Sequence, residues 1–301
     1  MTGIVTTTTR TNSLPYLQIQ PQRNRLHVTN GTNKSTSSSN GPRFGTELGQ
    51  ALEVGQFFLV YQPTIDLQTN AFAGVEALIR WRHPTRGVLN PVEFLSELEQ
   101  SGEIVPVGRW ALITACAQGA AWHERGYRFP VSVNIATKQF DDPAFDTIVD
   151  EALTSSQLDP MFLILEFPFS ILHHDKGNIA PRLELLHELG VRLAIDDLRP
   201  STAALTTLES FPISVVKLDR SFIAEIPESS SAQSLVLELV QMAKTRRLQI
   251  VASGIEDAEQ RERLQLNEVN TGQGFFFSEP HEASDIDTFL EDFSIFSGKP
   301  L

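Results

Sequence analysis

Short apolar runs alternate with longer helical segments along most of this chain. Eight runs are rich in β-branched and aromatic residues, which is typical of buried strands. Between them lie segments with helical periodicity, such as residues 108–126 and 232–247. Strands that alternate with helices favour crossover connections and a mainly parallel sheet, and eight such units in about 250 residues predict a (β/α)8 barrel of the TIM type. The eight predicted strands are FFLVYQP (57–63), GVEALIRW (74–81), VSVNIA (131–136), FLILEF (162–167), RLAIDD (192–197), VVKLD (215–219), QIVASGI (249–255) and GQGFFF (272–277).

The first 45 residues differ in composition from the rest of the chain. They are rich in Thr, Ser, Asn and Gln and contain few apolar anchors. Such a segment buries too little surface to offset the entropy lost on ordering. We therefore predict a disordered polar tail over residues 1–45, followed by one barrel domain over residues 46–298.

Charge and composition narrow the class of protein. The formal net charge of −13 argues against broad binding to DNA, which needs a basic surface. No apolar run approaches the roughly 18 residues that a membrane span requires. The single cysteine, Cys116, lies in a helical segment, where a small core residue is expected, and it excludes an internal disulfide. These features predict a cytoplasmic protein.

Polar side chains stand at or near the ends of most predicted strands. In a barrel of this class, the carboxyl ends of the strands form one rim that carries the functional site. Carboxylate and amide oxygens from several strands would therefore converge there, and hard oxygen ligands suit Mg²⁺ or Mn²⁺ better than zinc. The residues concerned are Glu76, Arg80, Asn134, Glu166, Asp196, Asp197, Lys217, Asp219, Ser253, Glu256 and Gln273.

These residues lie in motifs that resemble the EAL family of bacterial cyclic di-GMP phosphodiesterases. The resemblance runs from YQP at 61–63 to FFFSEP at 275–280, through EALIR (76–80), VSVNIA, LILEF, AIDDL, VKLDRSFI and GQGF in the family order. It implies a barrel with one antiparallel strand. It also implies a two-metal site, which cuts one phosphodiester bond to give a linear dinucleotide.

The resemblance also implies roles for individual residues. Lys217 would orient the attacking water or stabilise developing charge, with Asp219 and Glu256 as further catalytic or orienting acids. Substrate would contact Gln62, Leu78, Arg80 and Gln273, with Arg80 holding a phosphate through its planar guanidinium. The first metal would take Glu76, Asn134, Glu166 and Asp196, and the second would take Asp197 with Asp196 between the two ions.

Three positions depart from the family pattern. Ser253 in VASGIE stands where the family has a glutamate tied to the second metal and its water. The loop DDLRPSTAA (196–204) lacks both family glycines, and Pro200 removes a backbone donor. Phe169 replaces a second glutamate after Glu166. The first-metal set is thus complete, whereas the second-metal set is damaged.

Three functions remain open on this reading. The first is a catalytically impaired member that acts as a cyclic di-GMP receptor or regulatory interaction domain, with a homodimer or a regulatory protein as possible partner. The second is an active, metal-dependent phosphodiesterase. The third is a protein-interaction scaffold that binds no nucleotide. Tyr61 and the phenylalanines at 275–277 are candidates for stacking on guanine, although aromatics in strands are more often core residues.

Overall fold

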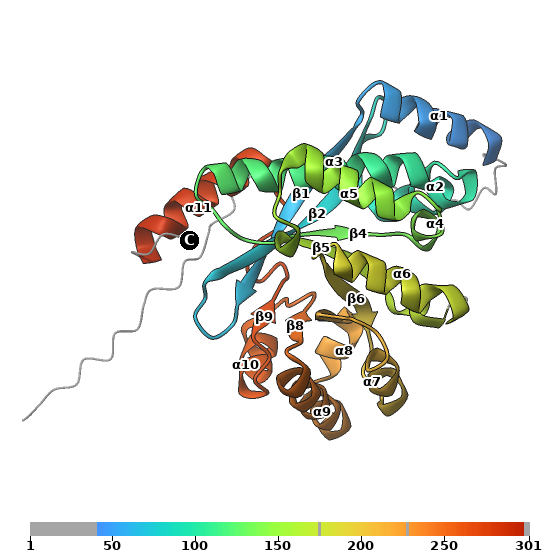
Figure 1. Ribbon diagram of the computed structural model, residues 1–301. Coiled ribbons are helices and arrows are strands. Elements are labelled where there is room, and N and C mark those ends of the chain that lie inside the picture. The colour runs from blue at the N-terminus through green and yellow to red at the C-terminus, as the bar shows by residue number, and fades with distance from the viewer. Residues whose placement is uncertain (1–40, 174–175, 227–228, 298–301) are drawn as a thin grey trace, which may run out of the picture. The chain divides into compact units, whose positions relative to one another are not determined.

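The structure is a computed structural model that describes residues 41–173, 176–226 and 229–297. Its strands form one closed barrel (Figure 1). The strands are β1 (Phe57–Asp66), β2 (Phe72–His83), β3 (Gly87–Leu89), β4 (Val131–Asn134), β5 (Leu163–Pro168), β6 (Arg192–Leu198), β7 (Val215–Leu218), β8 (Gln249–Ala252) and β9 (Thr271–Gly272). The short extra strand β3 pairs with β2 outside the ring.

The strand order confirms the predicted barrel and its single antiparallel member. The order runs β1-β9-β8-β7-β6-β5-β4-β2-β3, and a further pairing of β1 with β2 closes the ring. Strand β1 is antiparallel to both β2 and β9, whereas the strands from β2 round to β9 are parallel. The carboxyl ends of these parallel strands therefore form one rim.

The last predicted strand differs from the structure. Strand β9 ends at Gly272, and GFFF (274–277) forms a tight turn instead. Gly274 explains the break, because a Cβ on this residue would clash with the backbone of Ile255. The turn is held there by a hydrogen bond from the Phe276 amide to the Ile255 carbonyl.

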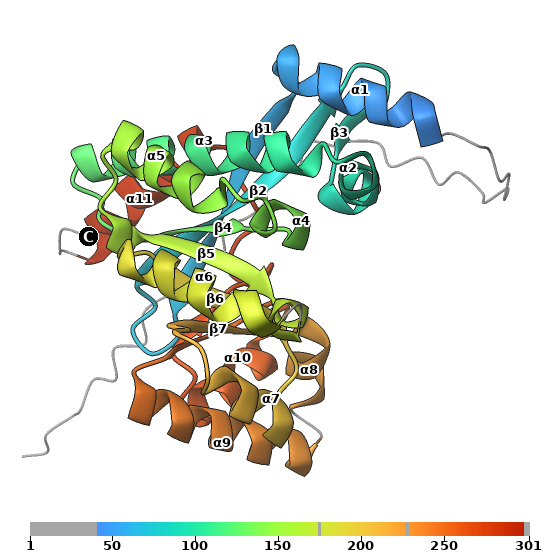
Figure 2. The same cartoon turned by 45° about the vertical axis from the view of Figure 1, so that its right-hand side comes forward.

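Helices cover the outside of the barrel (Figure 2). Several begin at side-chain caps: Ser229 Oγ accepts from the Ala232 amide at α9, and Asp257 accepts from the Gln260 amide at α10. The α-helices are α1 (Gly41–Glu53), α2 (Leu95–Ser101), α3 (Ile104–Glu124), α4 (Thr137–Phe140), α5 (Phe145–Ser156), α6 (Lys176–Glu188), α7 (Thr202–Leu208), α8 (Arg220–Glu225), α9 (Ser230–Arg246), α10 (Ala258–Leu266) and α11 (Ala283–Ser297), and the 3-10 helices are η1 (Pro91–Glu93), η2 (Pro160–Phe162) and η3 (Phe169–His173).

The main core lies between the barrel and these helices. It includes Cys116, which is fully buried, and Tyr61, whose ring packs edge-on against Trp122 at a centroid distance of 4.9 Å. Tyr61 is therefore a core residue and is not placed to stack on a ligand. Among the described residues, no helix is both long and apolar enough to span a membrane.

A second, smaller core lies where β1 and β2 extend beyond the barrel. Here α1, α2 and β3 pack around Phe57, Trp81 and Phe94. Helix α1 begins at Gly41, so the last five residues of the predicted tail, 41–45, are helical. The rest of that tail, residues 1–40, lies outside the described residues.

Candidate functional site

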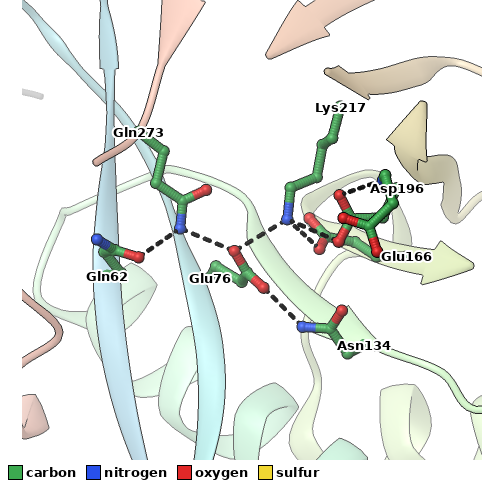
Figure 3. A network of polar contacts seen from close by, with 8 residues as sticks. Gln62, Glu76, Asn134, Glu166, Asp196, Lys217 and Gln273 are labelled. Carbon is green, nitrogen blue, oxygen red and sulfur yellow. Dashed lines mark hydrogen bonds and ion pairs between the residues drawn. The ribbon is translucent and has the colours of Figure 1, made fainter. Parts of the chain in front are cut away.

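Charged and amide side chains from five neighbouring strands meet at the carboxyl rim of the barrel (Figure 3). Glu76 comes from β2, Asn134 ends β4, Glu166 lies in β5, Asp196 in β6 and Lys217 in β7. The parallel pairing fixes the positions of these residues along the barrel axis, since Asn134 pairs with Glu166 and Pro168 pairs with Asp196. The structure thus brings together the four residues expected to hold the first metal, with Lys217 among them.

The ammonium of Lys217 stands at the centre of this cluster. Its Nζ lies 2.6 Å from Glu166 Oε2, 2.9 Å from Glu76 Oε2 and 3.5 Å from Asp196 Oδ2. Lys217, Glu76 and Glu166 are buried, and Asn134 Nδ2 donates to the other oxygen of Glu76 at 2.6 Å. Three carboxylates therefore share one buried cation, an arrangement that is stable only while all the charges stay paired.

Burial and charge pairing act in opposite directions on the pKa values here. Burial lowers the pKa of Lys217, but the three carboxylates outweigh it and raise that pKa well above its usual value. Burial raises the pKa of Glu76, yet the charge of Lys217 and hydrogen bonds from Lys217, Gln273 and Asn134 leave it lowered. For Glu166, burial and the charges of Glu76 and Asp196 prevail over Lys217 and raise the pKa to about 8.

Two glutamines hold Glu76 from the other side. Gln62 of β1 stands opposite Glu76 in the antiparallel register. Gln273 Nε2 donates to Glu76 Oε2 at 2.7 Å and to Gln62 Oε1 at 3.0 Å, and Gln62 Nε2 donates to the Ser278 carbonyl at 3.1 Å. Gln273 Oε1 is buried and has no hydrogen-bond partner in the described part of the chain. Both glutamines predicted to contact substrate thus lie at the cluster.

A pocket of about 250 Å³ opens beside the cluster, between the ends of β1, β2, β6, β7, β8 and β9. Asp197 lines it from β6 with the backbone in the left-handed region, at φ +53°. Burial, and then the charges of Asp196 and Asp219, raise the pKa of Asp197. A bound cation would relieve this repulsion, as expected for a residue assigned to a second metal.

Four other predicted residues stand farther from the cluster. Asp219 caps α8 by accepting from the Phe222 amide at 3.1 Å, and Glu256 lines the pocket but forms an ion pair with Arg220. Leu78 and Arg80 follow Glu76 along β2, outside the pocket wall, where Arg80 Nη1 donates to the Ile79 carbonyl at 2.8 Å.

The three departures from the family pattern have distinct environments. Ser253 lines the pocket, and its Oγ is buried without a hydrogen-bond partner among the described residues. Arg199 fastens the loop after β6, donating to both carboxylate oxygens of Glu225 at 2.7 Å. Phe169 is half-buried against the core and contacts the ring of His173. The serine hydroxyl therefore lacks a partner among the described residues, while Arg199 and Phe169 both make contacts.

The donor set fits a hard divalent cation in chemical type and charge. Within the described ranges, no group of three or more acidic, histidine or cysteine side chains is arranged to hold a metal directly. The acids turn towards Lys217 instead, so the ammonium supplies the positive charge that they require. Carboxylate and amide oxygens of this kind are ligands that Mg²⁺ and Mn²⁺ prefer.

Two pocket residues that the motif assignments left out are Arg220 and Phe275. Arg220 follows Asp219 in the VKLDRSFI motif, and Phe275 is 64% exposed on the pocket wall. Phe275 is one of the three phenylalanines proposed for stacking, whereas Phe276 and Phe277 pack against the core. For Arg220, the only signal in the sequence is its place two residues after the end of β7.

Comparison with known proteins shows which family the chain belongs to. The EAL domain model matches residues 46–280. The chain is 34% identical over 238 residues to the cyclic di-GMP phosphodiesterase PdeR of Escherichia coli K12, covering 79% of this chain and 36% of that protein. It is 35% identical over 256 residues to the cyclic di-GMP phosphodiesterase NbdA of Pseudomonas aeruginosa, covering 85% and 33%. The chain thus spans about a third of the length of these curated relatives.

Solved structures show the same fold. A cyclic di-GMP complex of the PaMucR phosphodiesterase superposes with a TM-score of 0.76 at 36% identity, covering 81% of this chain and 99% of the other. The FimX EAL domain of Pseudomonas aeruginosa, bound to cyclic di-GMP, has a TM-score of 0.72 at 20% identity, covering 79% and 96%, which supports the fold alone. This chain belongs to the EAL domain family.

Proposed function

We propose that this barrel binds cyclic di-GMP in the rim pocket, hydrolyses it poorly, and serves as a receptor or regulatory domain. The carboxylate and amide cluster supports binding, since related proteins with this domain are named as cyclic di-GMP phosphodiesterases. The single observation that carries the impairment is Ser253, a residue of the pocket wall whose hydroxyl is buried without a partner among the described residues.

The residues around Lys217 have the chemistry to hold metal. Glu76, Asn134, Glu166 and Asp196 would bind one Mg²⁺ or Mn²⁺, and Asp197 would contribute to a second. When bound, such ions polarise a phosphodiester and lower the pKa of a bound water. Gln62 and Gln273 would keep Glu76 oriented, because both belong to its hydrogen-bond network.

Serine is a poor replacement for an acid at position 253. Its hydroxyl is neutral near pH 7 and shorter than a glutamate side chain, so it supplies neither an anionic ligand nor a base. Glu256 is the nearest acid along the chain, but it is already paired with Arg220. The second-metal side of the pocket therefore lacks one negative charge.

Restoring the acid tests the proposal. We expect the wild-type protein to bind cyclic di-GMP with little linear product, and Ser253→Glu to raise turnover by about 10²- to 10³-fold, the usual effect of one well-placed active-site group. Binding is measured by calorimetry and product by chromatography with Mg²⁺ or Mn²⁺. Glu76→Ala in each background is the matched control for contaminating activity.

The outcomes separate the candidate functions. Wild-type turnover near ordinary enzyme rates of about 1 s⁻¹ or more would contradict impairment and show an active phosphodiesterase. That second function is favoured by the otherwise complete set of rim residues around Lys217. No binding at high micromolar concentration would instead contradict a nucleotide role and leave the scaffold hypothesis.

A further inference from the structure

Arg220 lines the pocket as the first residue of α8, two residues after the end of β7. Its aliphatic stem lies over Gly254, where a Cβ would stand 2.5 Å from Arg220 Cγ, and the backbone there adopts φ +76°. The guanidinium then reaches Glu256 to form an ion pair. Arg220 thus links the end of β7 to the loop after β8, where it contacts Gly254 and Glu256 next to Ser253.

The two cations of the pocket wall differ in how firmly they are held. Lys217 is buried and neutralises three carboxylates. Arg220 is 66% exposed and its partner Glu256 is 48% exposed. An exposed pair of this kind contributes little to stability, so a ligand with a stronger charge can displace Glu256. Among the described residues that line the pocket, Arg220 is therefore the cation available to a ligand.

The pocket wall is mainly acidic, so an exposed cation such as Arg220 matters for binding an anionic ligand. Four acids line the pocket, namely Glu76, Asp196, Asp197 and Glu256, against Lys217 and Arg220. A cyclic dinucleotide carries two phosphodiester charges. With the other three acids assigned to metal, Glu256 is the acid left on this wall, and Arg220 is the exposed cation that could meet a phosphate there.

We propose that Arg220 binds a phosphate of the cyclic dinucleotide by exchanging Glu256 for it. The planar guanidinium suits two-pronged contact with phosphate oxygens. This inference rests on the proposed function, because it names how the same pocket holds its second phosphate. Glu256 acts in it as a competitor that occupies the guanidinium when no ligand is bound.

Phe275 lines the same pocket as Arg220 and adds an exposed aromatic ring to it. It follows Gly274, which packs against Ile255, and a hydrogen bond of 3.0 Å from the Ile255 amide to the Gln273 carbonyl joins the two loops. The joined loops present an exposed aromatic ring in the pocket that the exposed guanidinium of Arg220 also lines. An aromatic ring can stack on a base, and a guanidinium can bind the neighbouring phosphate.

The test compares affinities of the full chain for cyclic di-GMP, by calorimetry with Ca²⁺ replacing Mg²⁺ to suppress turnover. Arg220→Gln keeps most of the stem over Gly254 and should weaken binding by about 10-fold or more, as expected for loss of a charged hydrogen bond. Arg220→Lys keeps a point charge and should weaken it by only about 2- to 3-fold. Glu256→Gln frees the guanidinium and should tighten binding by roughly 2- to 5-fold.

The affinity should change in opposite directions in Arg220→Gln and Glu256→Gln, whereas loss of a purely structural ion pair would change it in the same direction in both. Arg199→Gln is the matched control, since Arg199 also forms an exposed ion pair near the rim but does not line the pocket. Unchanged affinity in Arg220→Gln, or equal weakening in Arg220→Gln and Glu256→Gln, would overturn the inference and leave the proposed function standing. No binding by the wild-type protein would overturn both.

Discussion

At the scale of single residues, the charge of Lys217 holds the rim together in the absence of metal. Removing it leaves Glu76, Glu166 and Asp196 close together and unpaired. Breaking a buried ion pair from one side typically costs about 3–5 kcal/mol, so we expect Lys217→Met to lower the free energy of unfolding by roughly that amount. Urea unfolding at pH 8 with EDTA present measures it.

The stability of the same variant should rise at lower pH. Lys217 lowers the pKa of Glu166, so its removal raises that pKa above the present value of about 8. The folded variant then binds protons that the unfolded chain releases, and its stability rises as pH falls from 8 to 6. Lys244→Met, which breaks an exposed pair with Glu268, is the control and should change stability by less than about 1 kcal/mol. Equal effects of both variants would contradict this account.

At the scale of elements, the loop after β6 is tied to α8 by one side chain. Arg199 donates to Glu225 and, at 3.2 Å, to Ser221 Oγ, and Ser201 caps α7. Because the pair is exposed, we expect Arg199→Ala to cost at most about 1 kcal/mol globally. Amides of residues 199–204 should nevertheless exchange faster, since local opening depends on few contacts. Hydrogen-exchange mass spectrometry measures the difference.

A charge swap is the control for that element. Arg199→Glu combined with Glu225→Arg should restore protection of the loop, whereas either change alone should not. If loop protection were unchanged in Arg199→Ala, the buried Leu198 and Pro200 would be sufficient to hold the loop.

The elements also show what sequence patterns can and cannot predict. Buried strands such as VVKL can be predicted because each residue is either apolar or, like Lys217, part of the candidate site. The rim residues can then be predicted from the positions where those strands end. The length of β9 was not predictable, because the backbone contact between Gly274 and Ile255 is nonlocal. The second core around Trp81 was missed for the same reason, and the Arg220–Glu256 pair depends on two loops being adjacent.

At the scale of the whole molecule, helices α3 and α11 share the main core with the barrel. Helix α11 reaches back to α3, where Trp122 Nε1 donates to Asp287 Oδ1 at 2.7 Å and Arg125 pairs with the same aspartate at 2.5 Å. Tyr61 of β1 packs on the same tryptophan. Opening α3 therefore disturbs the barrel and α11 together, which favours cooperative unfolding.

Cys116 on α3 offers a measure of that cooperativity. Burial raises the pKa of its thiol to about 12, and the side chain is fully buried, so the native protein should react very slowly with a thiol reagent at pH 8. Labelling should then follow global unfolding, and its urea dependence should match that of the unfolding equilibrium. If the rim pocket binds cyclic di-GMP, ligand at about 100 times its Kd stabilises the fold by roughly 2.7 kcal/mol and should slow labelling by about 100-fold. Cys116→Ala provides the unlabelled baseline. Fast labelling with a rate that depends on neither urea nor ligand would show that α3 opens on its own. It would contradict cooperative unfolding of the main core.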